Sequence, residues 1–136
     1  MVMDHRNLRA FQLAHALVLY VYRATGSMPK DEQFAMRSQI RRAAVSVPTN
    51  IVEGRARRTQ KEFVHFLNIA LGSASELRYL LELAHELAFL QDSQIITDAD
   101  AVVRTLAGLI RRIEAGDTNF DSSVSRAGSG KREAES

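Results

Sequence analysis

The residues best suited to chemistry are the basic side chains of one short segment. Between positions 37 and 61 the chain holds seven basic residues and a single acid, Glu53. Their charges sum to +6, whereas the whole 136-residue chain carries only +2 at pH 7. Charge segregated in this way is typical of a surface that meets an anionic partner. Arginine and lysine neutralise phosphates and release counterions, which predicts salt-dependent affinity for nucleic acid with little sequence preference.

These cations divide into two groups by their expected helical faces. Arg37 and Arg41 are predicted to lie beside apolar bands at a subunit interface, where a guanidinium commonly pairs with a neighbour's carboxylate. The other group is predicted to face solvent and to contact phosphates. It consists of Arg42, Arg55, Arg57, Arg58 and Lys61. A purely structural alternative stays open for Arg57, because Glu53 and Arg57 have the i,i+4 spacing of an intrahelical ion pair.

Other arrangements that could support chemistry fail on geometry. Two Glu-x-x-His pairs, Glu62/His65 and Glu82/His85, match part of the motif of di-iron bundles. They lie on one predicted helix, about 30 Å apart along its axis and on different faces. We therefore predict no metal site. The chain shows no glycine-rich phosphate loop and no paired base and nucleophile, so we predict no cofactor and no enzymatic activity.

Four helices are expected to position these residues. Hydrophobic periodicity and capping residues place them at 8–25, 31–54, 59–90 and 97–116. Pro48 is expected to kink the second helix, because proline lacks an N–H and clashes with the preceding turn. We predict an all-α protein, an antiparallel up-and-down four-helix bundle that occupies residues 1–116.

Single residues indicate where these helices begin and end. Asn7 is the expected N-cap of the first helix. Thr59 and Glu62 have the spacing of a capping box at the start of the third. Gly116 is the expected glycine just after the fourth. Beyond it, residues 117–136 are rich in serine, glycine and charge, and we predict a disordered tail.

Two of the predicted helices are more apolar than a monomeric bundle requires. The fourth helix has one stripe about 120° wide, whereas the first covers roughly 200° and the third about 160°. The third stripe is widened by Ile69, Leu80 and Leu87. Because apolar patches of that size are unusual on monomers, we predict that they form the subunit interface of a homo-oligomer. The alternative is a loop or tail that covers the patch.

The composition indicates a soluble intracellular protein. Hydrophobic residues make up 46% and charged residues 25% of the chain, as in ordinary globular domains. The chain has no cysteine, which excludes disulfides and thiol chemistry and suits a reducing cytoplasm. The apolar run at 10–22 is too short and too interrupted to span a bilayer, so we predict no membrane association.

Two strings of residues carry a family resemblance. They are SQIRRAAVSVPTNIVEG at 38–54 and IALGSASEL at 69–77, accompanied by Pro29, Asp31, Glu32, Arg58, Phe63, Phe66 and Leu67. With these residues the chain resembles the 23S rRNA intervening-sequence proteins over most of its length, residues 8–116. The resemblance implies an up-and-down bundle that assembles as a homopentamer and has no defined catalytic residues.

The chain is also similar to the accessory variability determinant proteins of diversity-generating retroelements. That similarity implies a pentameric, basic bundle whose partners are a reverse transcriptase and nucleic acid. We therefore predict a non-enzymatic, oligomeric, cytoplasmic bundle that binds RNA or DNA through its exposed cations. The alternative is a protein-interaction scaffold whose arginines mainly serve subunit assembly.

Overall fold

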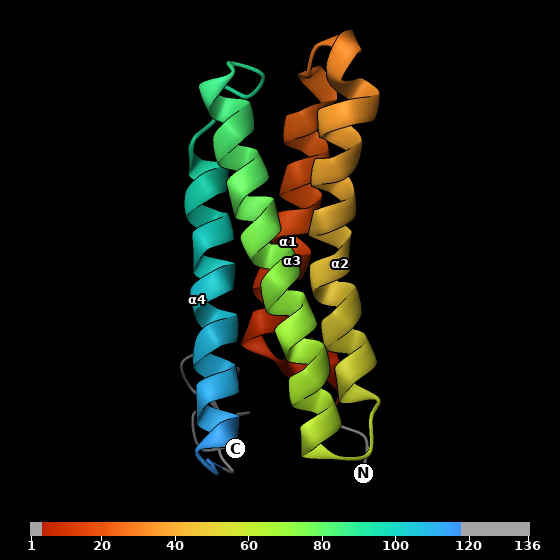
Figure 1. Cartoon of the computed structure of the whole chain (residues 1–136), viewed down its shortest axis with the longest axis vertical. Helices are drawn as coiled ribbons and strands as arrows, with labels where there is room; N and C mark the ends of the chain where they lie inside the picture. The colour runs from red at the N-terminus through yellow and green to blue at the C-terminus, as the bar shows by residue number, and fades with distance from the viewer. Residues whose placement is uncertain (1–3, 118–136) are drawn as a thin grey trace.

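Four antiparallel helices pack side by side in the computed structural model, which describes residues 4–117 apart from the side chain of Gln33 (Figure 1). The helices are α1 (Arg9–Ala24), α2 (Ser38–Arg55), α3 (Gln60–Glu86) and α4 (Gln94–Glu114). The described residues contain no strand. The predicted all-α, up-and-down four-helix bundle is therefore confirmed. The predicted tail, apart from Asp117, lies outside the described residues.

Apolar stripes from all four helices meet along the axis of the bundle. α4 is the clearest case, because its predicted stripe is buried at Val102, Leu106, Leu109, Ile110 and Ile113. Each such aliphatic side chain stabilises the fold by about 1.5 to 3 kcal/mol when it is fully buried. The largest fully buried side chains outside α4 include Leu8, Val21, Ile40, Val47, Ile51, Leu67, Leu77 and Leu81.

The segment that leads into α2 has irregular helical geometry. A 3-10 turn at Lys30–Glu32 is followed by a π-helical turn at Gln33–Arg37, and α-helical geometry begins only at Ser38. The prediction of one continuous α-helix from residue 31 is therefore wrong. α2 then continues through Pro48, which is buried. The helix tolerates the loss of the backbone hydrogen bond that proline, without an N–H, cannot donate.

Capping residues account for the starts of two elements. Thr59 caps α3, because its side-chain oxygen accepts a hydrogen bond from the Glu62 N–H at 3.1 Å, as the capping-box spacing predicts. The prediction of Asn7 as the cap of α1 is wrong. Asp4 instead caps a 3-10 turn at His5–Asn7, and α1 follows that turn without a side-chain cap.

α4 ends at a glycine in the left-handed conformation. Gly116 has a φ of 84°, which a residue without a Cβ adopts readily. Two backbone hydrogen bonds close the motif, from the Gly116 N–H to the Ile113 carbonyl at 3.0 Å and from the Asp117 N–H to the Arg112 carbonyl at 2.9 Å. This is the glycine stop that the sequence predicts.

α3 ends with a similar backbone turn but carries alanine at the left-handed position. Ala88 has a φ of 65°, and the Phe89 N–H donates to the Ala84 carbonyl at 2.8 Å. This turn ends α3 at Glu86, before the predicted end at residue 90. An L-residue in the left-handed conformation costs roughly 1 kcal/mol relative to glycine.

Ala88→Gly is expected to stabilise the bundle by about 1 kcal/mol, because glycine removes the left-handed strain. Gly116→Ala should cost a similar amount, since it places a Cβ in the same conformation at the end of α4. Urea denaturation followed by circular dichroism, at matched protein concentrations, measures both changes. Equal midpoints for Ala88→Gly and the wild type would show that the α3 turn is unstrained.

A side-chain hydrogen bond ties α1 to the loop between α3 and α4. The Tyr20 hydroxyl donates to the Asp92 carboxylate. This bond, with some desolvation, raises the pKa of Tyr20 to about 12, and it lowers the pKa of Asp92 below its usual value. Asp92 also accepts a hydrogen bond from the Gln94 N–H at 2.9 Å. The carboxylate therefore joins the C-terminal half of α1 to the first residue of α4.

The up-and-down connectivity brings distant segments to the same end of the bundle. In Figure 1 the N-terminus of α1, the loop between α2 and α3, and the C-terminus of α4 share the lower end. We call the cations at that end the basic pole: Arg9, Arg57, Arg58, Lys61, Arg111 and Arg112. The opposite end carries several acids, among them Asp31, Glu32, Glu86 and Asp92, together with the cations Arg23 and Lys30.

Candidate nucleic-acid interface

Arg58 and Lys61 are the predicted phosphate contacts with the most open surroundings. Both residues are exposed, Arg58 in the loop after α2 and Lys61 in the first turn of α3. Within residues 4–117, no carboxylate forms an ion pair with either of them. An exposed cation without an ion pair keeps its hydrogen-bond donors for an anionic partner.

Arg57 lies beside them but has two partners in its own chain. Its Nη2 atom lies 3.2 Å from Glu53 Oε2, which is the ion pair that the i,i+4 spacing predicts. Its guanidinium carbon also lies 5.5 Å from the centroid of the Phe66 ring. An exposed pair of this kind stabilises by only about 0.3 to 0.5 kcal/mol, so a phosphate can compete with Glu53 for Arg57.

Arg55 does not belong to this surface, and its predicted phosphate contact is wrong. The residue is only 7% exposed, and its guanidinium carbon lies 5.1 Å from the centroid of the Phe63 ring. The last turn of α2 approaches the first turn of α3 closely, because Gly54 has no side chain to hold the two helices apart. The residue that follows Gly54 is therefore covered by α3 instead of facing solvent.

Arg42 is exposed, as predicted, but it lies far from the basic pole. Arg55 follows it thirteen positions later in α2, which corresponds to about 20 Å along a helix. Arg42 faces a shallow groove between α2 and α3, together with Ser46, Ser73 and Glu76. The two serines share a hydrogen bond of 2.8 Å that joins the helices. The structure therefore does not bring Arg42 together with the other predicted contacts.

The two arginines predicted at a subunit interface have different surroundings. Arg41 uses its donors within the chain, because Nε donates to Thr25 Oγ1 at 2.9 Å and Nη2 donates to the Tyr22 carbonyl at 3.0 Å. Its guanidinium carbon also lies 4.4 Å from the centroid of the Tyr22 ring. These contacts tie α2 to the end of α1 and account for Arg41 without a second subunit. Arg37, half-buried in the π-helical turn, stays a predicted interface residue.

Of the apolar residues predicted at the interface, some are exposed and one is buried in the core. Ile69 and Leu87 are 40% and 49% exposed, which agrees with surplus apolar surface on α3. Leu80 is only 6% exposed and packs in the core, so its place at the interface is wrong. It turns inward because α3 is flanked by both α2 and α4. The other large exposed apolar side chains are Leu19, Tyr22, Phe34, Val45, Val52 and Tyr79.

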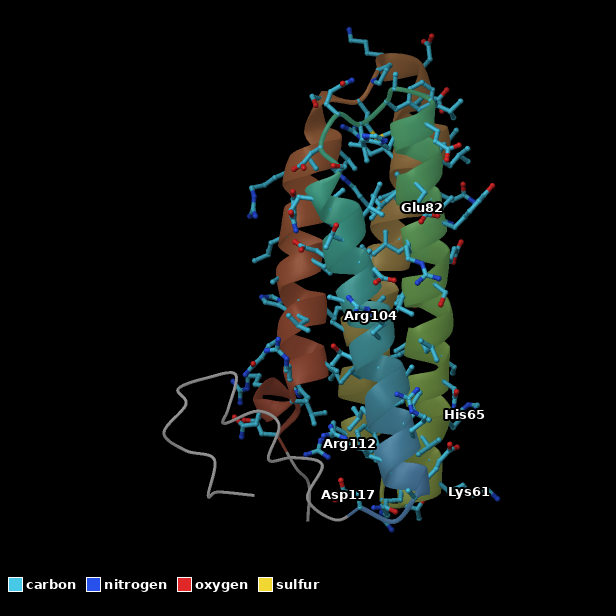
Figure 2. The ribbon with its side chains drawn as sticks, turned by 90° about the vertical axis from the view of Figure 1, so that its left-hand side faces the viewer. Lys61, His65, Glu82, Arg104, Arg112 and Asp117 are labelled. Atoms are coloured by element: carbon cyan, nitrogen blue, oxygen red, sulfur yellow. The ribbon has the colours of Figure 1, made fainter. Side chains whose placement is uncertain are left out.

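Arg9, Arg111 and Arg112 belong to the basic pole, but no sequence pattern joins them to the cations around Arg58. The only local signal is a pair of adjacent arginines in the last turn of α4, where cations complement the helix dipole. Figure 2 shows Arg112 of α4 and Lys61 of α3 toward the same end of the molecule. The positive surface is therefore larger than the segment that predicts it.

The part of the chain that the structure describes contains no cluster of side chains suited to metal binding. No group of three or more histidines, cysteines, aspartates or glutamates between residues 4 and 117 could hold a metal ion. His65 and Glu82, one from each Glu-x-x-His pair, lie far apart along the bundle in Figure 2. At the surface, a side-chain hydrogen bond from Arg6 at 3.1 Å lowers the pKa of Asp4. None of the described helices is both long and apolar enough to cross a membrane.

Similarity to known proteins agrees with this architecture. The family model of the 23S rRNA-intervening sequence protein matches residues 6–109. The chain belongs to this family. The match includes all of α1, α2 and α3 and most of α4, so the resemblance that the sequence motifs predict is confirmed for this 23S rRNA-intervening sequence protein.

A solved structure shares the fold of this 23S rRNA-intervening sequence protein. It is the crystal structure of a protein of unknown function from the S23 ribosomal protein family of Bacteroides thetaiotaomicron VPI-5482. The TM-score is 0.69 and the sequence identity is 24%, over 75% of this chain and 95% of that chain. At that identity the likeness shows the fold alone. No curated protein has a significantly similar sequence.

Proposed function

We propose that this 23S rRNA-intervening sequence protein is a non-enzymatic, oligomeric bundle that binds RNA or DNA in the cytoplasm. The basic pole supplies its phosphate contacts. The observation that carries the proposal is that two distant segments bring exposed cations to one end of the bundle, Arg58 and Lys61 from the α2–α3 connection and Arg111 from the last turn of α4. Such a surface attracts a polyanion without reading its sequence.

The charges at the two ends favour binding at the basic pole in particular. Asp31, Glu32 and Glu86 lie near the opposite end and offset the cations there, Arg23 and Lys30, so the basic pole attracts a polyanion more strongly than the other end does. Arg57 adds a further cation when a phosphate competes with its carboxylate partner. Arg42 remains a predicted contact for a strand that runs along α2.

Assembly into a ring would repeat the basic pole. Ile69, Tyr79 and Leu87 leave apolar surface on α3 that a second subunit can bury. We propose a cyclic homo-oligomer, and the family resemblance makes the pentamer the specific prediction. In a ring the poles lie side by side, so several weak phosphate contacts act together on one strand.

A protein-interaction scaffold is the second candidate function. Phe34 favours it, because this large side chain is 91% exposed in the π-helical turn before α2. Aromatic anchors dominate the energetics of many protein interfaces. The similarity to accessory variability determinant proteins suggests a reverse transcriptase or another protein as the partner. Arg37 lies in the same turn as Phe34. Loss of the oligomer in Arg37→Ala, seen by light scattering, would favour this function.

Replacing Arg58 and Lys61 together with glutamine is expected to weaken the binding of a short single-stranded RNA by about tenfold at low salt. The slope of log affinity against log salt should also fall by about 1.4, roughly 0.7 for each phosphate contact that is lost on a single strand. Filter binding over a series of salt concentrations measures both quantities. Light scattering of the same samples shows whether assembly is intact.

The matched control is Arg23/Lys30→Gln, which removes the same charge near the end opposite the basic pole. Its affinity and salt slope should stay close to those of the wild type. Equal losses in both double variants would show an effect of net charge and not of the basic pole. A wild-type protein that binds neither RNA nor DNA at low salt would exclude the proposed function.

A further inference from the structure

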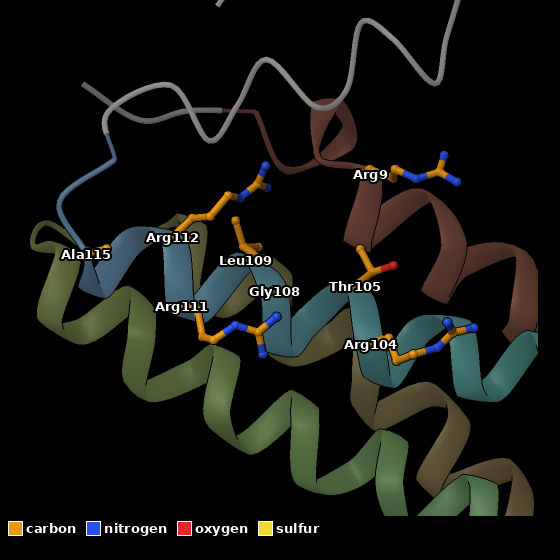
Figure 3. A pocket seen from close by; sticks show the side chains of 8 residues that line it. All are labelled: Arg9, Arg104, Thr105, Gly108, Leu109, Arg111, Arg112 and Ala115. Atoms are coloured by element: carbon orange, nitrogen blue, oxygen red, sulfur yellow. The ribbon is translucent and has the colours of Figure 1, made fainter.

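A groove lies between the first turn of α1 and the C-terminal half of α4 (Figure 3). Its volume is about 570 Å³, which is in the range of pockets that hold small ligands. Four of its eight lining residues are arginines, Arg9 from α1 and Arg104, Arg111 and Arg112 from α4. None of the lining residues is acidic. Positively charged side chains from two helices therefore line the same groove.

Most of this charge is not compensated within the described chain. Arg104 forms an ion pair with Asp100, whose Oδ2 atom lies 2.9 Å from Arg104 Nε. Arg78 of α3 pairs with the same carboxylate, because its Nη1 atom lies 2.9 Å from Asp100 Oδ1. The other three arginines of the groove form no ion pair between residues 4 and 117. Like charges gathered around one groove repel each other, and a bound anion relieves that repulsion.

One of these arginines has a buried donor that lacks an acceptor. The Nε atom of Arg112 is buried, and no described residue accepts a hydrogen bond from it. A buried unsatisfied donor destabilises the fold, and more so when the group is charged. A phosphate oxygen in the groove would supply the missing acceptor, and the planar guanidinium suits bidentate pairing with phosphate.

The centre of the groove is kept open by a glycine. Gly108 lies inside α4, where glycine makes a helix less stable than alanine does. A Cβ at this position would meet only the Arg111 Nη2 atom, at 3.8 Å, so packing within the fold does not require glycine. The neighbouring Thr105 adds a hydroxyl donor to the lining. A small residue beside these donors leaves room for a tetrahedral anion.

The helix dipole alone does not explain this arrangement. Cations in the last turn stabilise a helix, which accounts for Arg111 and Arg112. It does not account for Arg9, which reaches the same groove from α1, near the other end of the sequence. No aromatic side chain lines the groove, so stacking on bases is not its mode of recognition. The groove can bind a ligand through its positive charge and its hydrogen-bond donors.

We propose that this groove binds phosphate groups, either of a nucleic-acid strand or of a free polyphosphate. The inference rests on the proposed function in its first form, because a strand held at the basic pole can extend from the α2–α3 loop into the groove. If the ligand is a free polyphosphate, the inference does not depend on the proposed function. The chemistry is the same in both cases, namely guanidinium forks around a tetrahedral oxyanion.

Inorganic tripolyphosphate is the probe, titrated by calorimetry into the full chain at low salt. Arg9/Arg112→Gln is expected to weaken binding by about tenfold or more, because each charged hydrogen bond is worth about 1.5 to 3 kcal/mol. Arg23/Lys30→Gln removes the same charge near the other end of the bundle and should bind like the wild type.

Gly108→Leu separates a built site from diffuse attraction. It keeps every charge and raises helix propensity, so the variant should fold, but its side chain occupies the centre of the groove. Binding of tripolyphosphate should fall by about tenfold, as for loss of a charged hydrogen bond. Wild-type affinity in this variant, or no binding by the wild-type protein, would overturn the proposal.

RNA binding by the same variants identifies the source of the phosphate. Loss of both RNA and tripolyphosphate affinity in Gly108→Leu supports a nucleic-acid strand in the groove. Loss of tripolyphosphate affinity alone supports a free polyphosphate. If RNA binding depends on Arg58 and Lys61 but the wild type does not bind tripolyphosphate, the groove proposal fails while the proposed function stands. If the wild type binds tripolyphosphate but neither RNA nor DNA, the groove proposal stands while the proposed function fails.

Discussion

Gly54→Ala is expected to destabilise the bundle by about 1 to 3 kcal/mol, although alanine is normally the better helix residue. A Cβ at position 54 would lie 2.9 Å from Phe66 Cβ and 3.0 Å from Phe63 Cδ1. It would also lie 3.3 Å from the Phe63 carbonyl oxygen, so backbone atoms as well as side chains are in its way. To accept the methyl group, α2 and α3 must separate at the end that carries the basic pole.

Gly72→Ala is the matched control for this substitution. Gly72 is exposed inside α3, and a Cβ there would have nothing within 4 Å. Alanine should therefore stabilise the helix by about 0.5 to 1 kcal/mol. Urea midpoints must be compared at the same protein concentration, because assembly makes apparent stability depend on concentration. A Gly54→Ala protein as stable as Gly72→Ala would contradict the close approach of α2 and α3.

Arg55→Ala is expected to cost about 2 to 4 kcal/mol, from lost packing and a lost cation–π contact. The residue is only 7% exposed and its guanidinium lies over the Phe63 ring, so truncation uncovers apolar surface. Arg58→Ala removes the same charge three positions later but from an exposed site. It should change the free energy of unfolding by less than about 0.5 kcal/mol.

Arg55→Met tests whether Arg55 also contacts a ligand. Methionine keeps much of the apolar stem and should recover about half of the stability lost in Arg55→Ala. Because the guanidinium is buried, its loss should leave the salt slope of RNA binding unchanged. A slope that falls by about 0.7 in a folded Arg55→Met protein would return Arg55 to the nucleic-acid surface.

Stability and the proposed binding surface are coupled at one end of this fold. The loop that carries Arg57 and Arg58 is held between the last turn of α2 and the Thr59 cap of α3. The glycine contact beneath it sets how closely those two helix ends approach. Gly54→Ala should therefore also displace the loop, whereas Ala88→Gly acts at the other end of α3 and leaves it in place.

Much of the fold follows from interactions between residues that are close in the chain. The buried stripe of α4, the Thr59 cap and the Gly116 stop are all predictable, because periodicity, capping and left-handed glycines are local effects. The same reasoning fails at Ala88 and in the π-helical turn before α2. There the residue types favour ordinary helix, and the backbone conformation is imposed by how the helices join.

The candidate site, by contrast, depends on neighbours that a single helix does not contain. The sequence groups Arg55 with the solvent-facing cations of the turn after it and places Leu80 at the outer edge of the apolar stripe. In the fold, α3 covers Arg55 and the flanking helices bury Leu80. Arg9 and Arg112 lie at opposite ends of the bundle-forming sequence and line one groove only because antiparallel packing joins the first and last helices. Charge and periodicity, which are properties of the residues, were enough to predict a helical bundle with an anionic partner. Which cations are exposed and lie together, and so could contact an anionic partner, is decided by packing, because burial and convergence are properties of the assembled helices.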